Sequence, residues 1–266
     1  MIDVISQICI YNDYPIFRQL LTKYRNKFNK IILYASRHHG VIDEEEFMRR
    51  TFPETWVSTE IDWTTPGIDW RQVETEPLLE KSEAEWILFM EQDFFCDDWD
   101  KLWRDVEEAM KTSDMIGWWN PSRFPYIHPC FLLIKREVLD KTNKDFRAHP
   151  EIVGSDHFAQ ITRDVEKLGG KITTLQSMGY KEWENAMHLG GLTYPYQNWK
   201  GDGTDEFGVG NPEAFTVYNY WSRQAPVEQD PKYLSLSEEI GETLRQLFPA
   251  LDLENNPWTK FFKINV

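Results

Sequence analysis

The segment Trp86-Ile87-Leu88-Phe89-Met90-Glu91-Gln92-Asp93 constrains the fold more than any other part of this sequence. Five consecutive apolar residues bounded by charge are typical of a strand that is buried on both faces, as in a parallel sheet covered by helices. The strand ends in two carboxylates, Glu91 and Asp93, which are separated by one residue. In an open α/β sheet, ligands bind beyond the carboxyl ends of the strands, so these carboxylates lie where a ligand would arrive.

A Glu-x-Asp pair at the end of such a strand can bind a hard divalent cation, and the cation can bridge phosphate oxygens. Acidic residues at the start of a solvated loop would give the same pattern, because carboxylates are common on protein surfaces. The spacing alone leaves both interpretations open.

Apolar strand patterns alternate with helical patterns through most of the chain. Strands are expected at 4–10, 30–35, 55–58, 86–90, 115–119, 130–134 and 171–175, and helices at 15–28, 43–50, 69–82, 98–110, 158–168 and 235–247. Strands and helices in this order favour a mostly parallel sheet flanked by helices, with right-handed crossovers. The fold class predicted from the sequence is therefore α/β.

The overall charge and the cysteine content restrict the partners and the compartment. A net charge of −15 disfavours nucleic acid as a partner, because binding a phosphate backbone needs a basic surface. The sequence has no run of about 18 apolar residues and no signal-like N-terminus, so no transmembrane segment and no secretion are expected. The three cysteines form no Cys-x-x-Cys pattern and are typical of reduced thiols. These features predict a cytoplasmic protein.

Five short motifs follow one another along the first part of the chain. They are Pro66–Arg71, Trp86–Asp93, Leu132–Leu139, Gly154–Asp156 and Gly170–Ile172, and His188 comes after the last of them. In order and spacing they resemble the nucleotide-sugar glycosyltransferases of the GT-A fold, closest to the inverting glycosyltransferase family 2. The resemblance covers roughly residues 1–192.

The chain departs from the family pattern at three points. Glu91 replaces the first aspartate of the metal motif, and Ser155 replaces the glutamate that usually precedes Asp156. The family also uses an aspartate after the second strand for the nucleobase, and none is evident in 36–40.

The resemblance implies a hexosyltransferase-like enzyme that moves a sugar from a nucleoside-diphosphate sugar to a hydroxyl of a glycan or another acceptor, with inversion. Asp156 would act as the general base. Glu91, Asp93 and His188 would bind Mn²⁺ or Mg²⁺ at the diphosphate, and Mn²⁺ suits the mixed oxygen and nitrogen ligands better. Arg71 would lie beside the nucleotide.

Trp199 and Lys200 introduce a glycine-rich acidic stretch, 201–210. Glycines supply hinges, so this stretch can form a lid in which Trp199 covers the donor and Lys200 faces its diphosphate. A plain surface loop explains the same residues. Trp118, Trp119 and Trp183 are candidates for stacking on the acceptor, although tryptophans are also common in cores.

The site residues also have ordinary structural explanations. Asp156 or Ser155 could simply cap a helix, His188 could be a polar residue next to a Gly-Gly turn, and Arg71 could be a solvated helix charge. The predicted division is a core at 1–192 and, at 193–266, a mobile loop with a C-terminal extension that packs on the core.

Two other functions remain open from the sequence. One is a GT-A-like domain that binds a sugar nucleotide or a glycan without turnover. The other is a glycoside hydrolase with two carboxylates. The hydrolase is disfavoured because Glu91 and Asp93 leave the same strand end and would not flank a glycosidic bond.

Overall fold

The computed structural model describes residues 1–8, 14–35, 56–57, 70–121, 124–148, 157–189, 211–224, 242, 246 and 249–264. The chain divides into two compact units. Unit 1 comprises Met1–Ile8, Asn26–Glu91 and Asp98–Lys181, and unit 2 comprises Cys9–Arg25, Gln92–Asp97 and Glu182–Val266. A single domain boundary after residue 192 stays a prediction.

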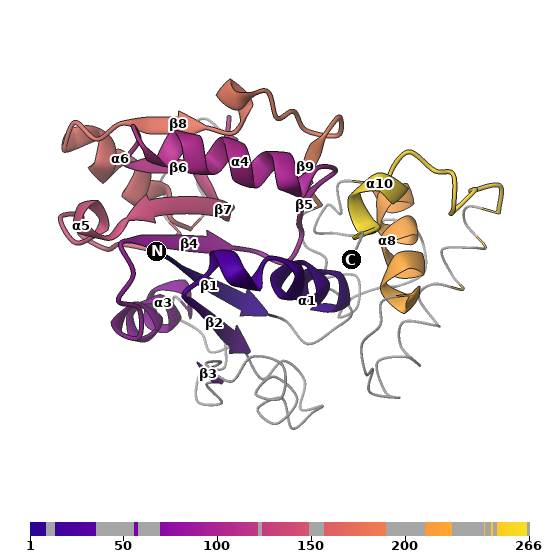
Figure 1. Cartoon of the computed structure of the whole chain (residues 1–266), viewed down its shortest axis with the longest axis horizontal. Coiled ribbons are helices and arrows are strands. Elements are labelled where there is room, and N and C mark those ends of the chain that lie inside the picture. The colour runs from indigo at the N-terminus through magenta and orange to yellow at the C-terminus, as the bar shows by residue number, and fades with distance from the viewer. Residues whose placement is uncertain are drawn as a thin grey trace. The chain divides into compact units, whose positions relative to one another are not determined.

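Unit 1 is built on a seven-stranded sheet with the order β3-β2-β1-β4-β7-β6-β8, in which β4 is central (Figure 1). The strands are β1 (Ile2–Ile8), β2 (Lys30–Ala35), β3 (Trp56–Val57), β4 (Trp86–Met90), β6 (Met115–Asn120), β7 (Tyr126–Lys135) and β8 (Ile172–Thr174). Of these seven strands, β7 alone runs antiparallel to its neighbours. The mostly parallel α/β sheet predicted from the sequence is confirmed.

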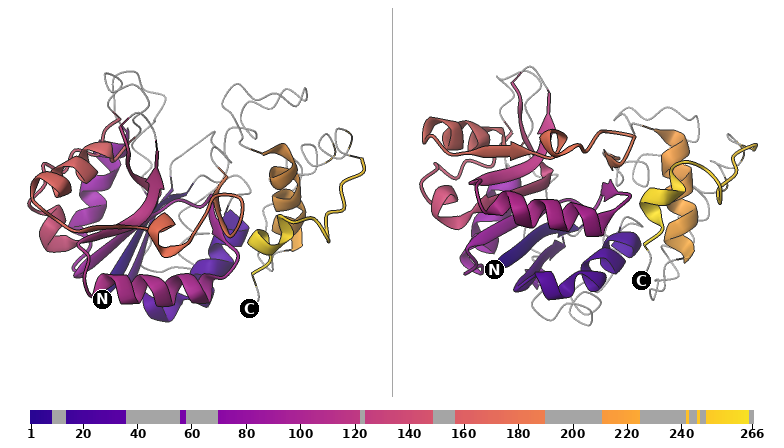
Figure 2. Two further views of the ribbon diagram at one scale, coloured as in Figure 1. Left: turned by 90° about the horizontal axis from the view of Figure 1, so that it is seen from above. Right: turned by 45° about the horizontal axis from the view of Figure 1, so that its top comes forward.

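Helices flank both faces of this sheet. They are α3 (Trp70–Glu80), α4 (Trp99–Met110), α5 (Arg136–Leu139) and α6 (Ala159–Lys167), with 3-10 turns at Arg25–Lys27 and Gln176–Met178. Figure 2 shows α4 on one face, with α3 and α6 on the other. Asp98 caps α4, since its carboxylate accepts the backbone N–H of Lys101 at 2.8 Å.

Successive side chains of β4 and β7 point to opposite faces of the sheet, and each face packs against its own set of helices. On one face, Phe89 packs against Phe158 and Phe146, with ring centroids 4.9 and 6.0 Å away, inside a core that extends to α3, α5 and α6. On the other face, Trp103 of α4 contacts Phe131 at 6.0 Å and Phe28 at 5.4 Å. Because both faces of the central strand are buried, its sequence is apolar throughout.

Unit 2 contains α1 (Tyr14–Lys23), α8 (Pro212–Gln224), α10 (Thr259–Phe262) and a two-stranded antiparallel sheet of β5 (Phe94–Cys96) and β9 (Ala186–His188). Its core joins Phe95, Tyr218 and Phe262, whose ring centroids lie 4.9 to 5.7 Å apart. The burial of three large aromatic side chains stabilises this small sheet.

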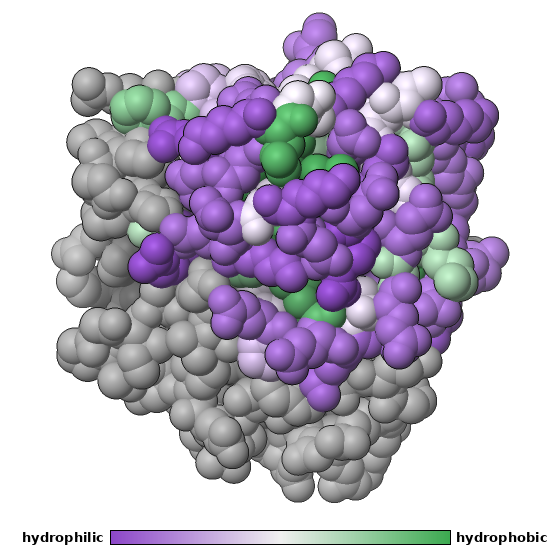
Figure 3. Space-filling model, turned by 90° about the vertical axis from the view of Figure 1, so that its left-hand side faces the viewer, coloured by the Kyte–Doolittle hydropathy of each residue, from purple (hydrophilic) through white to green (hydrophobic). Residues whose placement is uncertain are grey.

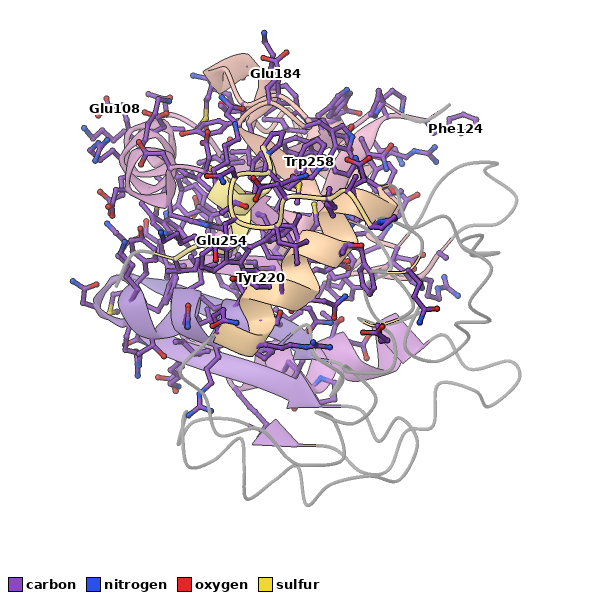
Figure 4. All side chains as sticks on the ribbon, turned by 90° about the vertical axis from the view of Figure 1, so that its right-hand side faces the viewer. Glu108, Phe124, Glu184, Tyr220, Glu254 and Trp258 are labelled. Carbon is purple, nitrogen blue, oxygen red and sulfur yellow. The ribbon has the colours of Figure 1, made fainter. Side chains whose placement is uncertain are left out.

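The C-terminal segment of unit 2 contacts α8 and the turn before β9. Tyr220 donates a hydrogen bond of 3.0 Å to Glu254, and both residues are labelled in Figure 4. Trp258 packs edge-on against Trp183, with ring centroids 5.2 Å apart. Trp183 has a left-handed backbone, with φ of 64°. Such a conformation is costly for a tryptophan and needs support from its surroundings.

Several expectations from the sequence differ from the structure. The strand expected at 130–134 begins earlier, at Tyr126, and α8 and α10 were not predicted. Leu168 is 49% exposed, so the apolar stripe predicted for α6 ends before it. The helix expected at 43–50 lies outside the described residues, as does most of the one at 235–247.

The described surface carries few large apolar side chains. Figure 3 shows a mainly hydrophilic face, and Met1 and Leu168 are the large hydrophobic residues exposed among the described ones. In the part of the chain that the structure describes, no helix has the length and apolar character needed to cross a membrane.

Candidate functional site

Glu91 extends the central strand by one residue at the carboxyl edge of the sheet. Met90 pairs with Phe131 of β7, and the next backbone amide, of Glu91, donates a 3.1 Å hydrogen bond to the carbonyl of Cys130. The backbone of Glu91, the first acidic residue of the predicted metal motif, is thus fixed by a hydrogen bond to the neighbouring strand, and the residue is partly buried.

Two further side chains that bind metals in other proteins lie on the facing strand. His128 and Cys130 are two residues apart in β7 and both are buried, and a ring nitrogen of His128 lies within 4.8 Å of Sγ of Cys130. The imidazole Nδ1 of His128 lies 3.9 Å from Oε2 of Glu91. The sequence analysis did not include either residue in the site.

A bulge shapes the start of β7. Gly117 of β6 pairs with Leu132, but Trp118 pairs with His128, so the register shifts between these two residues. A Cβ on Gly117 would lie 2.3 Å from Cγ2 of Ile127 and 2.4 Å from the carbonyl oxygen of Phe131. Only glycine permits this close approach. Pro129, which has no N–H for a ladder, lies within the same irregular region.

The backbone fixes the tautomer of His128. The N–H of Cys130 donates a 3.0 Å hydrogen bond to Nδ1 of His128. A nitrogen that accepts a hydrogen bond carries no proton, so the neutral ring has its proton on Nε2. His128 therefore presents the lone pair of Nδ1 to the backbone amide of Cys130.

Unit 2 brings Asp93 and His188 together. Asp93 directly precedes β5, and His188 is the last residue of β9, where it pairs with Phe94. Next to this pair, the amide of Leu189 donates a 2.9 Å hydrogen bond to the carbonyl of Asp93. Nε2 of His188 lies 3.3 Å from Oδ1 of Asp93. Strand pairing thus joins two site residues predicted from distant parts of the sequence.

The Asp93 carboxylate is incompletely satisfied. Asp93 is 8% exposed, and its Oδ1 is buried without a hydrogen-bond partner among the described residues. The ion-pair distance to His188 therefore does not correspond to a hydrogen bond. A buried carboxylate oxygen that accepts no hydrogen bond is costly, and a bound cation would remove that cost. Asp93 and His188 together fit one edge of a cation site.

The other predicted site residues are less completely described. Arg71 lies in the first turn of α3, and its side chain is outside the described part. Asp156, Trp199 and Lys200 also lie outside the described residues, so their roles stay predictions. The helix that follows Asp156 begins at Ala159 with Phe158 as its N-cap. The N-cap of this helix is thus Phe158 and not one of the two alternatives, Ser155 and Asp156, that the sequence left open.

Neither a protein-family model nor a curated protein matches the sequence. Among solved structures, the chain is similar to the mannosyltransferase PcManGT from Pyrobaculum calidifontis in complex with GDP-Man and Mn²⁺, with 14% identity over 94% of this chain and 74% of that chain, at a TM-score of 0.48.

Two other solved structures are similar to a comparable degree. S. aureus TarS 1-349 in complex with UDP-GlcNAc has 13% identity over 97% of this chain and 78% of that chain, at a TM-score of 0.45. The galactosyltransferase LgtC, in complex with donor and acceptor sugar analogs, has 8% identity over 88% of this chain and 99% of that chain, at a TM-score of 0.46. At these TM-scores, the α/β assignment rests on the strand order of the chain itself.

Proposed function

We propose that this protein is a metal-dependent inverting glycosyltransferase that transfers a sugar from a nucleoside-diphosphate sugar to a hydroxyl acceptor. The observation that supports this proposal most directly is the buried Oδ1 of Asp93, which has no hydrogen-bond partner among the described residues and lies 3.3 Å from His188 Nε2. It lies three residues beyond the end of the central strand, where open α/β sheets bind their ligands.

The proposed metal ligands are Glu91, Asp93 and His188, each offering one ligand atom. Two carboxylates and a neutral imidazole balance the charge of a divalent cation. Because Gln92 alone separates the two acidic residues, their Cα atoms are held within roughly 7 Å by the chain itself. Carboxylate with imidazole suits Mn²⁺ better than Mg²⁺, which favours oxygen ligands and retains its water.

The chemistry divides between the leaving group and the acceptor. A divalent cation would stabilise the charge that gathers on the departing nucleoside diphosphate by several kcal/mol. Asp156 is proposed to take the proton from the acceptor hydroxyl as that oxygen attacks the anomeric carbon. Lys200 and Trp199 are proposed to cover the diphosphate, and Arg71 to contact the nucleotide.

The cysteine content favours a cytoplasmic location for this reaction. The chain has three cysteines, and the two that the structure describes, Cys96 and Cys130, are buried. A few cysteines with no Cys-x-x-Cys pattern are typical of proteins in reducing compartments. We therefore propose that the enzyme works on cytoplasmic nucleotide sugars.

Nucleotide release from a panel of UDP- and GDP-sugars, measured with and without Mn²⁺ and with glycan acceptors, tests the proposal. Release that needs both Mn²⁺ and an acceptor is the expected result. Donor binding without release would indicate a non-catalytic domain, and glycan cleavage without any nucleotide would indicate a hydrolase. NMR of the first product tests inversion, because retention of the donor configuration would contradict it.

A further inference from the structure

We propose that Trp183 and Trp258 form an aromatic platform on unit 2 that binds an uncharged oligosaccharide. Both tryptophans belong to this unit, Trp183 in the turn before β9 and Trp258 at the start of α10. The oligosaccharide is the acceptor of the proposed transfer, and this assignment rests on the proposed function. Binding of the sugar to the platform does not depend on transfer.

The two tryptophans form a corner at the surface of unit 2. Both are partly exposed, and their rings meet edge to face, with centroids 5.2 Å apart and planes at 74°. The apolar C–H groups of a sugar ring can pack on such aromatic surfaces while its hydroxyls stay hydrated. Of the other tryptophans predicted to stack on an acceptor, Trp118 is buried and Trp119 packs against the core of unit 1.

Trp258 is fixed by its backbone and by its ring. Its N–H donates a 2.9 Å hydrogen bond to Oδ1 of Asn256, and its carbonyl accepts the amide of Phe261 at 3.0 Å. Its ring also stacks on the buried Phe261, with centroids 6.2 Å apart and planes at 26°. An aromatic side chain that is already ordered loses little conformational entropy when a ligand binds.

The turn that carries Trp183 is strained and is tied to α10. The left-handed φ of 64° at Trp183 is costly for a side chain of this size, and its N–H donates a 2.9 Å hydrogen bond to the carbonyl of Ala186. Lys260 Nζ donates to the carbonyl of Glu184 and lies 3.4 Å from Oδ2 of Asp97. Strained residues that their surroundings hold in place cluster at ligand-binding sites, which supports a binding role for Trp183.

Polar groups beside the platform favour an uncharged sugar. Glu182 and Glu184 are exposed and Asn185 is partly exposed in the same turn, and Glu184 and Trp258 are labelled in Figure 4. Carboxylates and amides form hydrogen bonds with sugar hydroxyls, whereas two carboxylates repel anionic glycans and phosphates. The central part of a protein–protein interface is depleted of such charges, so this surface fits a glycan better than a protein.

The strand β9 connects the platform to the proposed metal ligands. Trp183 precedes β9, whereas His188 ends it, next to Asp93. Because Trp183 and His188 are five residues apart, the chain keeps their Cα atoms within about 18 Å. The platform and the proposed metal site would therefore contact different sugar residues of one acceptor. Longer acceptors should accordingly bind more tightly than monosaccharides.

Calorimetry with neutral oligosaccharides of glucose, mannose and N-acetylglucosamine, from the monosaccharide to the hexasaccharide, tests the platform directly. At least one neutral series should bind with an affinity that rises with length, and oligogalacturonate should not bind. Trp258→Ala should raise Kd by at least about tenfold, whereas Trp258→Phe keeps an aromatic face and should lose much less. Trp221→Ala, which removes a partly buried tryptophan of α8 in the same unit, is the control.

Absence of binding by every neutral series, or an unchanged Kd in both Trp183→Ala and Trp258→Ala, would overturn the proposal. Thermal unfolding separates lost binding from lost folding, and if Trp258→Ala does not fold, Trp258→Leu decides. The double variant Glu182→Gln/Glu184→Gln keeps both rings and should allow oligogalacturonate to bind. Binding of oligogalacturonate by the unmodified protein would contradict the preference for an uncharged sugar.

A transfer assay tests the role of the platform in the proposed reaction. Trp258→Ala should raise KM for the long acceptor by at least about tenfold, with kcat and the KM for a monosaccharide acceptor nearly unchanged. Equal effects on long and short acceptors would indicate a merely structural role. If no transfer is found, calorimetry still decides the platform and only the proposed function fails. Transfer without sugar binding at the platform would reject the platform and leave the proposed function intact.

Discussion

The hydroxyl of Ser82 donates a hydrogen bond of 2.8 Å to the carboxylate of Asp3, joining two residues that are 79 positions apart. Asp3 is fully buried at the start of β1. Four more donors complete its shell, namely Asn29 Nδ2, Lys30 N, Glu83 N and Ala84 N, at 2.9 to 3.3 Å. One carboxylate thereby ties together the beginnings of β1, β2 and β4.

We expect Asp3→Asn to lower the free energy of unfolding by about 2–4 kcal/mol, because a donor group would then face donors in a buried position. Ser82→Ala removes one of the five hydrogen bonds and should cost about 1 kcal/mol. Urea unfolding measures both values. The exposed Glu137→Gln is the control, and an Asp3→Asn protein as stable as that control would contradict the prediction.

Gly117→Ala should destabilise unit 1 by about 3 kcal/mol or more, because the added methyl group meets the backbone at Phe131 as well as the side chain of Ile127. Gly170→Ala is the comparison. There the added Cβ would come within 2.7 Å of Cγ1 of the buried Val165 and 3.1 Å of its carbonyl oxygen, so the clash with the backbone is milder than at Gly117. Thermal unfolding of both variants checks the difference, and a loss in Gly117→Ala no larger than that in Gly170→Ala would contradict the prediction.

The pKa of Asp114 lies below its ordinary value of 3.8. The largest cause is the backbone N–H of Lys171, which donates to Oδ2 at 2.9 Å, and Lys135 Nζ adds a 2.9 Å hydrogen bond to Oδ1. Because folding lowers this pKa, the ionised carboxylate contributes stability above the unfolded-state pKa. That stability is lost as the pH falls through the lower, folded-state pKa.

Asp114→Asn should therefore reduce stability at neutral pH, and the difference from the unmodified protein should shrink as the pH falls below 3.8. Urea unfolding across this range measures it. Lys135→Met retains the Lys171 contact and should show a smaller effect at neutral pH. A difference that stays constant with pH would rule out ionisation of Asp114 as the source.

Asp93→Asn should remove the rise in Tm that Mn²⁺ is expected to produce. Without the metal, the variant should unfold at the same or a higher temperature, since the buried Oδ1 of Asp93 has no hydrogen-bond partner among the described residues. Asp98→Asn is the control, because asparagine also caps helices and should preserve both α4 and the Mn²⁺ response. A full Mn²⁺ response in Asp93→Asn would exclude Asp93 as a ligand.

Asp156→Asn is expected to lower kcat by about 10²–10⁴ while donor affinity survives, because the change removes a base and leaves the proposed metal ligands intact. Asp93→Ala should instead weaken Mn²⁺-dependent nucleotide binding. Single-turnover rates and donor titrations distinguish the two outcomes. Full activity in Asp156→Asn would show that another group accepts the proton.

The sequence predicted the central parts of the fold because their signals are local. Trp86–Met90 is apolar from end to end and is β4, and the stripe after Asp98 is α4. The helix α8 also had a local signal that was overlooked. Asn211 accepts backbone hydrogen bonds from Glu213 and Ala214 at 3.0 and 3.1 Å, and Pro212 occupies the first turn.

Other parts of the site could not be predicted because they depend on distant pairing. Because a proline is rare inside a strand, Pro129 led to a predicted strand that starts only at residue 130. Neither His128 nor Cys130 was therefore expected opposite Glu91. Only the family resemblance indicated that Asp93 and His188 meet, because their contact depends on a ladder between β5 and β9 that no local periodicity reveals. Residue types indicated which side chains could bind a cation, whereas strand pairing determined which of them meet.

The reversed direction of β7 has a consequence for engineering this site. Because β7 runs against β4, the residues that come first in β7 lie at the edge where β4 ends. Positions 128 and 130 therefore belong to a strand rather than to a connecting loop. Exchanging these two side chains would change the chemistry beside Glu91 while the lengths of the surrounding loops are retained.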